Sequence, residues 1–231
     1  MAKQRVSSEF RDRRRERAAA PAADPASQSQ HESKLKFLDA ALHVIRAKGY
    51  SATRIDDVCE AAGLTKGSFF HHFESKEELA LAAADHFVAG AGRLFASAAY
   101  QELGDPLERL LGYVDLRAAI LQGELPDFTC LLGTMVQEAY ATSPAIRATC
   151  ERHIDDGAAA LAADIAEAKA LYAPSAAWTP QSLALFTQAV IQGAFVLAKA
   201  KQGPEVAVDC IRHLRRYLET QFDRSTRKKG A

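Results

Sequence analysis

Residues 53–76 read TRIDDVCEAAGLTKGSFFHHFESK, and this stretch decides the fold of the chain. Its first part predicts a short helix, because four residues spaced by three and four fall on one apolar face: Ile55, Val58, Cys59 and Ala62. We expect Thr53 to cap this helix, with Asp56 completing a capping box. Gly63 follows at once, at the position where a left-handed conformation costs least for a residue without Cβ.

The second part of the stretch predicts another short helix. Thr65 is placed to cap it, and Phe69 and Phe73 are one turn apart and can both face inward. The remaining side chains then lie on the outside: Lys66, Gly67, Ser68, Phe70, His71 and His72. A short helix, a glycine turn and a helix with small and donor-bearing residues near its start are typical of a DNA-binding helix-turn-helix.

Residues 47–79, AKGYSATRIDDVCEAAGLTKGSFFHHFESKEEL, resemble the DNA-binding domain of the TetR family of bacterial transcriptional regulators. The resemblance covers about residues 33–80, and many elements recur at fixed spacing. Beyond it, the chain is similar to the family only in length and helical style. The matching elements are Gly49-Tyr50, Thr53, Ile55, Ala61-Ala62-Gly63-Leu64, Gly67-Ser68-Phe69, His72-Phe73 and Lys76-Glu77.

The resemblance implies which residues meet DNA. Bases or phosphates would be contacted by Lys66, Ser68 and His72, and the DNA backbone by Thr53, Arg54 and Lys76, with Thr65, Gly67 and His71 beside them. The family usually has tyrosine at Phe70, and its hydroxyl commonly touches a phosphate; Phe70 can press on the backbone but cannot donate. For any one of these residues the alternative is an ordinary solvated face.

Composition suits a helical protein of one or two domains. The chain has 231 residues, of which 48% are hydrophobic. No apolar run is expected to span a membrane, and no signal peptide is recognised. The four cysteines lie far apart, without the spacing of a disulfide framework, so we expect a reducing, cytoplasmic setting.

Charge distribution is more informative than the formal net charge of zero. Residues 1–20 hold seven basic and three acidic side chains, a net charge of +4. Such a segment can attract DNA phosphates without reading sequence, or it can be a solubilising tail. We expect residues 1–30 to be a disordered basic arm and residues 224–231 a basic tail.

The all-α fold class then divides into two functional parts, a helix-turn-helix domain over residues 31–78 and a helical ligand-binding and dimerisation domain over residues 79–223. The first helix is expected to begin near Glu32 and to end at Gly49, with an apolar stripe made of Leu35, Leu38, Leu42 and Ile45. A long helix opening at Ser75 would, by resemblance to the family, join the DNA head to the body.

Caps predict the later helices. Asp105-Pro106, Ser143-Pro144 and Thr179-Pro180 each begin a helix, and Gly203-Pro204 separates the last two. The last two helices carry wide apolar faces, which could bury against their own domain or, as in the family, form a homodimer with a second subunit. Those faces consist of Leu183, Phe186, Val190, Ala194 and Leu197 on the first helix, and Cys210, Ile211, Leu214, Tyr217, Leu218 and Phe222 on the second.

An apolar pocket for a small-molecule effector is expected among the helices between Asp105 and Ala170. Aromatic or apolar bulk is assigned to Phe87, Tyr113, Phe128, Met135 and Trp178, while Arg117 or Glu138 could orient a ligand or lie on the surface. The effector would be small and mostly hydrophobic. Cys130 is either a thiol that senses electrophiles or a buried, inert side chain.

No cofactor or metal is expected. Cys150 with His153 and Cys210 with His213 form two C-x-x-H pairs that could supply a zinc site, but chance is the simpler explanation. The sequence has no G-x-S-x-G, phosphate-binding glycine loop or H-E-x-x-H motif, so an enzyme using Cys130 is the weaker hypothesis. A helical scaffold without DNA binding is the other alternative. The sequence as a whole predicts a DNA-binding repressor that a small hydrophobic molecule releases from a palindromic operator.

Overall fold

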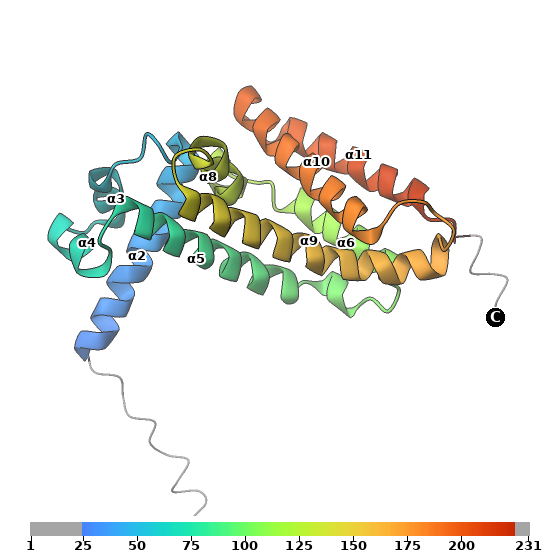
Figure 1. The fold of residues 1–231 in the computed structure, drawn as a ribbon, viewed down its shortest axis with the longest axis horizontal. Helices are drawn as coiled ribbons and strands as arrows, with labels where there is room; N and C mark the ends of the chain where they lie inside the picture. The colour runs from blue at the N-terminus through green and yellow to red at the C-terminus, as the bar shows by residue number, and fades with distance from the viewer. Residues whose placement is uncertain (1–24, 225–231) are drawn as a thin grey trace, which may run out of the picture. The chain divides into compact units, whose positions relative to one another are not determined.

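Every regular element of residues 25–224, the range that the computed structural model describes, is a helix (Figure 1). The all-α prediction is therefore confirmed. The chain divides into two units between Lys36 and Phe37, so helix α2 (Pro25–Lys48) crosses the boundary. Residues 1–24 of the predicted basic arm and residues 225–231 of the predicted basic tail lie outside the described range, whereas residues 25–30 of the arm are helical.

Helix α2 begins at Pro25, earlier than the expected start near Glu32. Proline fits the first position of a helix, and the Ala and Gln residues that follow are good helix formers, so nothing delays the start. Of its predicted apolar stripe, Leu38 and Ile45 are buried, whereas Leu35 and Leu42 are only half-buried. Phe37, Ala41 and Val44 complete the buried face.

The helix-turn-helix consists of α3 (Ile55–Ala62) and α4 (Lys66–His72). Gly63 adopts the predicted left-handed conformation, with φ 64° and ψ 32°, and Thr65 caps α4 by accepting a hydrogen bond of 3.2 Å from the Ser68 amide. Helix α5 (Lys76–Ala96) follows, capped by Ser75 as expected.

The predicted cap of α3 was wrong by one residue. The cap is Arg54, whose amide donates to Asp57 Oδ2 at 2.7 Å, so neither Thr53 nor Asp56 forms the expected capping box. Thr53 instead turns inward, and its hydroxyl donates to the Gly49 carbonyl at 2.6 Å. A hydroxyl held there is not available to the helix N-terminus.

The body contains one 3-10 turn, η1 (Ala99–Glu102), and six further helices. The predicted caps Asp105, Ser143 and Thr179 are confirmed, each accepting a hydrogen bond from a first-turn amide. Gly203-Pro204 separates the last two helices, as expected. The six helices are α6 (Pro106–Ala119), α7 (Leu125–Phe128), α8 (Leu131–Ala139), α9 (Pro144–Tyr172), α10 (Pro180–Lys201) and α11 (Glu205–Gln221).

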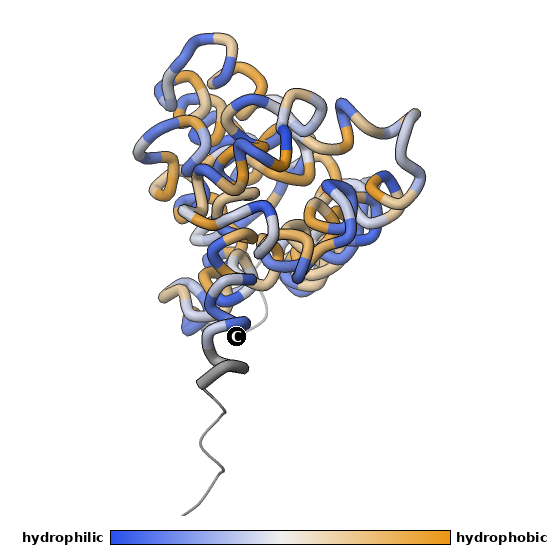
Figure 2. The backbone as a smooth tube through the Cα atoms, turned by 90° about the vertical axis from the view of Figure 1, so that its left-hand side faces the viewer, coloured by the Kyte–Doolittle hydropathy of each residue, from blue (hydrophilic) through white to orange (hydrophobic). Residues whose placement is uncertain are grey.

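Helix α9 is the centre of the unit that starts at Phe37, because α5, α6, α8 and α10 all pack against it. Helix α11 packs on α10 and α6, and the α10–α11 pair lies side by side (Figure 1). Apolar and polar residues alternate around the helical turns (Figure 2), so each helix can bury one face and expose the other. Helices α3 and α4 lie together beside the first turns of α5 (Figure 1).

Helices α5 and α10 are long and apolar enough to cross a membrane by length and composition alone, which the sequence analysis had not expected. Helix α10 packs against α9 and α11, and α5 against α8 and α9. Core helices of soluble proteins meet the same criterion, so the observation is weak evidence for a membrane partner.

Candidate nucleic-acid interface and adjoining cavity

Three phenylalanines fix helix α4 to helix α2. Phe37 packs edge-on against Phe69 and Phe73, with ring centroids 5.6 and 6.3 Å apart, and all three side chains are at most 2% exposed. The inward placement of Phe69 and Phe73 that the spacing predicted is confirmed. This cluster holds the opposite face of α4 in a fixed orientation toward solvent.

The outer face of α4 contains the predicted contact residues. Lys66, Gly67, Phe70 and His71 are exposed, whereas Ser68 and His72 are half-buried. His72 lies against the Phe37 ring at 6.1 Å, so less of it is available than predicted. Phe70 is 52% exposed on this face, so its ring is free to contact another molecule there.

Charged side chains flank this face. Lys66 Nζ lies 2.9 Å from Asp56 Oδ1, in an exposed ion pair that a stronger anion could replace. The Arg54 side chain is 80% exposed and lies 3.7 Å from Asp57. The Thr65 hydroxyl oxygen already accepts a hydrogen bond from the Ser68 amide as the cap of α4. The 1% exposure of Thr53 does not support the predicted side-chain contact with DNA.

Lys76, which was predicted to contact the DNA backbone, has partners within the chain. Its ammonium donates to the carbonyls of Tyr50 and Thr53, each at 3.0 Å, and lies 4.4 Å from the centroid of the Tyr50 ring. These groups belong to the turn between α2 and α3. Lys76 therefore fastens the first turn of α5 to the entrance of the helix-turn-helix.

Two further links join the body to the segment that precedes the helix-turn-helix, one at the turn before α3 and one at helix α2. The Ser51 amide donates to Glu138 Oε2 at 2.7 Å, and the same carboxylate lies against Gly49, whose φ is 91°. Arg46 donates from Nη1 to the carbonyls of Asp127 and Thr129, both at 3.3 Å. Glu138 was predicted to orient a ligand, but this contact makes it part of the joint between α8 and the turn before α3.

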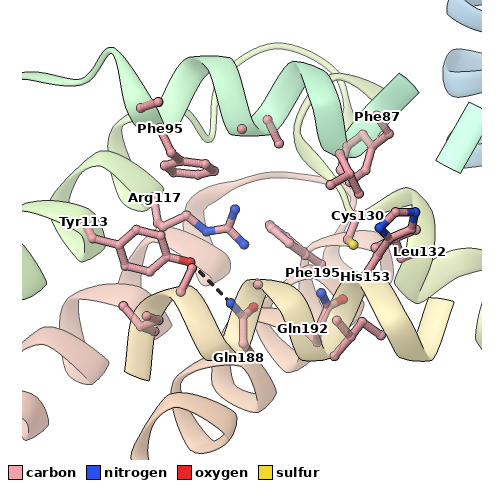
Figure 3. A pocket seen from close by; sticks show the side chains of 18 of the residues that line it. Phe87, Phe95, Tyr113, Arg117, Cys130, Leu132, His153, Gln188, Gln192 and Phe195 are labelled. Atoms are coloured by element: carbon pink, nitrogen blue, oxygen red, sulfur yellow. Dashed lines mark hydrogen bonds between the residues drawn. The ribbon is translucent and has the colours of Figure 1, made fainter. Parts of the chain in front are cut away.

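A cavity of about 410 Å³ lies between α5, α6, α9 and α10 (Figure 3). It brings together five of the predicted ligand residues, Phe87, Tyr113, Arg117, Phe128 and Cys130. The walls are mostly aromatic and aliphatic, with a few polar groups, which is the usual form of a small-molecule site.

The other three predicted ligand residues lie elsewhere. Met135 is fully buried in the core, because its helix α8 turns that face away from the cavity. Glu138 lines a second hollow of about 250 Å³ together with Lys199. Trp178 packs on Phe222 with ring centroids 5.4 Å apart, and Lys169 lies over its indole. The indole therefore lies between the α9–α10 loop and the end of α11, away from the cavity.

Sequence reasoning missed several residues of the cavity. Gln188 and Gln192 are polar residues one turn apart on an otherwise apolar face of α10, a signal that could have been used. Phe95 lies on α5, and Phe195 lies one turn beyond Gln192 on α10, but neither helix shows by itself which residues meet across the cavity. Tyr100, His153 and Asp164 also line it.

The cysteines differ in environment. Burial raises the pKa of the Cys150 thiol to about 11, which keeps it protonated and unreactive. Cys130 is half-buried in the cavity wall, where its sulfur caps α8 by accepting from the Gly133 amide at 3.4 Å. Within residues 25–224 no His, Cys, Asp and Glu side chains are grouped to hold a metal ion.

A helix-turn-helix on an all-helical body with an adjoining cavity is the arrangement typical of a DNA-binding regulator. Two family models match the chain: the bacterial regulatory proteins of the tetR family over residues 37–83, and the tetracyclin repressor-like C-terminal domain over residues 106–214. The chain belongs to the TetR family of transcriptional regulators, which are not enzymes.

Relatives extend this similarity over nearly the whole chain. The transcriptional regulator AcuR of Cereibacter sphaeroides is 27% identical over 205 residues, covering 89% of this chain and 92% of the relative. The transcriptional repressor DhaR of a Mycobacterium species is 28% identical over 70% of this chain and 80% of its own length. The crystal structure of a regulatory protein TetR from Rhodobacter sphaeroides superposes with a TM-score of 0.72 at 26% identity, covering 82% of this chain and 98% of that one.

Proposed function

We propose that the protein is a homodimeric repressor, released from a palindromic operator when a small, mostly hydrophobic molecule fills the cavity. The observation that carries this proposal is the position of α5. Its first residue, Lys76, holds the turn that leads into α3, and its later residues Phe87 and Phe95 line the cavity. One helix therefore touches both the DNA-reading element and the cavity.

The mechanism is a shift between two populations. A ligand releases DNA only if it binds the non-binding arrangement more tightly than the DNA-binding one. A ligand that moves α5 or the Asp127–Thr129 segment would act on the helix-turn-helix through Lys76 and Arg46. Residues 31–78 then form the DNA-reading part and residues 79–223 the responding part, although both pack in one unit from Phe37 on.

DNA contacts are assigned to the exposed side of the helix-turn-helix. Arg54 and Lys66 supply positive charge, Phe70 supplies an apolar surface for the sugar-phosphate backbone, and Ser68 and His71 can reach groove atoms. Gly67 allows close approach. Two copies would present two such helices to successive major grooves of an operator in the cytoplasm.

The homodimer is assigned to α10 and α11, because large apolar side chains remain exposed there: Leu185, Phe186, Val196, Leu197 and Tyr217. The rings of Phe186 and Tyr217 contact each other across the two helices, with centroids 4.9 Å apart. The other predicted interface residues are mostly buried within the chain, Leu183, Ile211, Leu214, Leu218 and Phe222 among them.

A mobility-shift assay with the DNA upstream of its own gene tests the proposal. The protein should retard this fragment and not an unrelated one, and a thermal-shift screen of small molecules should yield compounds that release it. Specific binding that no stabilising compound reverses would contradict ligand control, and absence of specific binding would contradict repression at that site.

A further inference from the structure

Arg117 is the feature of the cavity that its apolar walls do not explain. Its guanidinium extends from α6 into the space between α5 and α10, facing Phe95, Gln188 and Phe195 (Figure 3). Its Cζ lies 5.3, 5.8 and 5.9 Å from the ring centroids of Phe95, Tyr113 and Phe195. The cation is thus held by aromatic rings.

No hydrogen bond or ion pair joins the Arg117 guanidinium to any residue between 25 and 224. Aromatic rings can offset part of the cost of burying the charge, but they accept none of its five N–H groups in strong hydrogen bonds. No polar side-chain atom in the described range is both fully buried and unpaired. The free donors of Arg117 must therefore be accessible, and Figure 3 shows that they point into the cavity.

The other ionisable groups that line the cavity already have partners. Asp164 Oδ1 accepts from Arg109 Nε at 2.9 Å, and His153 Nε2 lies 2.7 Å from Asp85 Oδ1. Gln188 donates from Nε2 to Tyr113 Oη at 3.4 Å, which leaves its carbonyl oxygen free for a ligand. An empty cavity therefore presents one uncompensated positive charge.

We infer that the effector is a monocarboxylic acid, with its carboxylate on Arg117 and its apolar body toward Phe87 and Leu132. The guanidinium fork matches a carboxylate in a bidentate pair, and one cation neutralises one negative charge. A dianion such as a phosphate monoester would keep an unpaired charge in an apolar site, which is costly. The apolar body would lie among the aromatic and aliphatic side chains at the far end of the cavity (Figure 3).

The volume limits the size of the acid. About 410 Å³ is near the lower end of the roughly 300–1,000 Å³ typical of small-molecule pockets. Acids with a short alkyl chain or a single aromatic ring fit this volume. The inference rests on the proposed ligand response, and it names the chemistry that this response would recognise.

Calorimetric titration of the purified protein without DNA tests the assignment. The probes are octanoate and 4-phenylbutanoate, each compared with its own primary amide, which has similar shape but no charge. At least one acid should bind ten-fold or more tightly than its amide. Arg117→Met should abolish that preference, whereas Arg147→Met, which removes an exposed charge outside the cavity, should preserve it.

The comparison in the unmodified protein needs no variant, so a poorly folding Arg117→Met would not remove the test. The assignment is overturned if neither acid binds more tightly than its amide. It is also overturned if the preference for the acid over the amide survives in Arg117→Met. The proposed repression is judged separately by the mobility shift. Release of DNA by a neutral compound, with no binding of either acid, would leave repression standing and refute the carboxylate.

Discussion

Lys66 begins α4 and Lys76 begins α5, but the two ammonium groups have different partners. Lys66 pairs only with the exposed Asp56, whereas the Lys76 ammonium is shared between two carbonyls of the turn before α3. An exposed ion pair contributes little to stability, because solvent screens it and two long side chains lose freedom. The two lysines should therefore respond differently to substitution.

Lys66→Ala should weaken DNA binding without affecting the fold. If Lys66 exchanges Asp56 for a phosphate, its loss lowers the slope of log affinity against log salt by about one unit per subunit. Fluorescence anisotropy on operator DNA at several salt concentrations measures both effects, and Lys201→Ala on α10 is the control. Unchanged affinity and slope would remove Lys66 from the interface.

Lys76→Met should instead destabilise the fold. Methionine keeps much of the stem but removes the side-chain donor of the Thr53 carbonyl and one of the two donors of the Tyr50 carbonyl, a loss of about 1–3 kcal/mol. Thermal or denaturant unfolding measures the change, with Lys66→Ala as the control. Native stability combined with a lower salt slope would restore the phosphate contact that the sequence had predicted.

Cys130 offers a direct choice between two kinds of inducer. Cys130→Ser should still be released from DNA by a reversible ligand, because the sulfur only caps α8 and a hydroxyl can do the same. Cys150 is not a substitute sensor, because burial raises its pKa to about 11 and its thiolate is scarce near neutral pH. A Cys130→Ser variant that stays on DNA while its inducer releases the unmodified protein would establish an electrophile sensor.

Helix α8 is joined to the turn before α3 by Glu138, and this joint can be opened by one substitution. Glu138→Ala removes the acceptor of the Ser51 amide, so that amide and those of α3 should exchange hydrogen faster. Hydrogen-exchange mass spectrometry should show the change over residues 49–62 and none over α10 and α11. The neighbouring Gln137→Ala is the control, because Gln137 bonds only within its own helix. Unaltered exchange at residues 49–62 would show that the joint does not support α3.

The helices were largely predictable because their signals are local. Asp105, Ser143 and Thr179 act as caps through bonds to amides two or three residues away, and Gly63 ends α3 through its own backbone conformation. The error at α3 arose where a second local partner competes. The Thr53 hydroxyl donates to the Gly49 carbonyl, four residues earlier, instead of capping α3, and helix periodicity does not reveal that choice.

The site was predictable only in part because its composition depends on contacts that are not local. Phe87, Tyr113, Arg117, Phe128 and Cys130 were assigned to the pocket, but Met135 and Trp178 have the same apolar character and pack elsewhere. Which apolar residue meets a cavity depends on the rotation of each helix about its axis. That rotation is set by contacts between helices far apart in sequence.

The exposed apolar face of α10 and α11 should govern assembly. Phe186→Asp should lower the free energy gained on dimerisation by about 2 kcal/mol for each subunit, because the apolar ring is no longer buried at the interface. Two-fold symmetry doubles this loss to about 4 kcal/mol, which corresponds to a roughly thousand-fold weaker dimer. Light scattering after size exclusion measures the mass, and Leu171→Asp on α9 is an exposed control. A dimer that persists at low protein concentration would move the interface elsewhere.

Leu214, which the sequence had placed on the dimer face, gives the opposite expectation. It is 3% exposed within the single chain, so a carboxylate there should unfold the protein rather than only separate the subunits. Comparing Leu214→Glu with Phe186→Asp by circular dichroism distinguishes the core of the subunit from its outer face.

The contact between Gly49 and Glu138 also has an evolutionary consequence. At a φ of 91° any side chain at position 49 is strained, and a carboxylate oxygen of Glu138 also occupies the place where its Cβ would stand. Shortening the residue at position 138 would remove only the second obstacle. Among descendants of the same ancestor, glycine at position 49 should therefore persist even where position 138 changes.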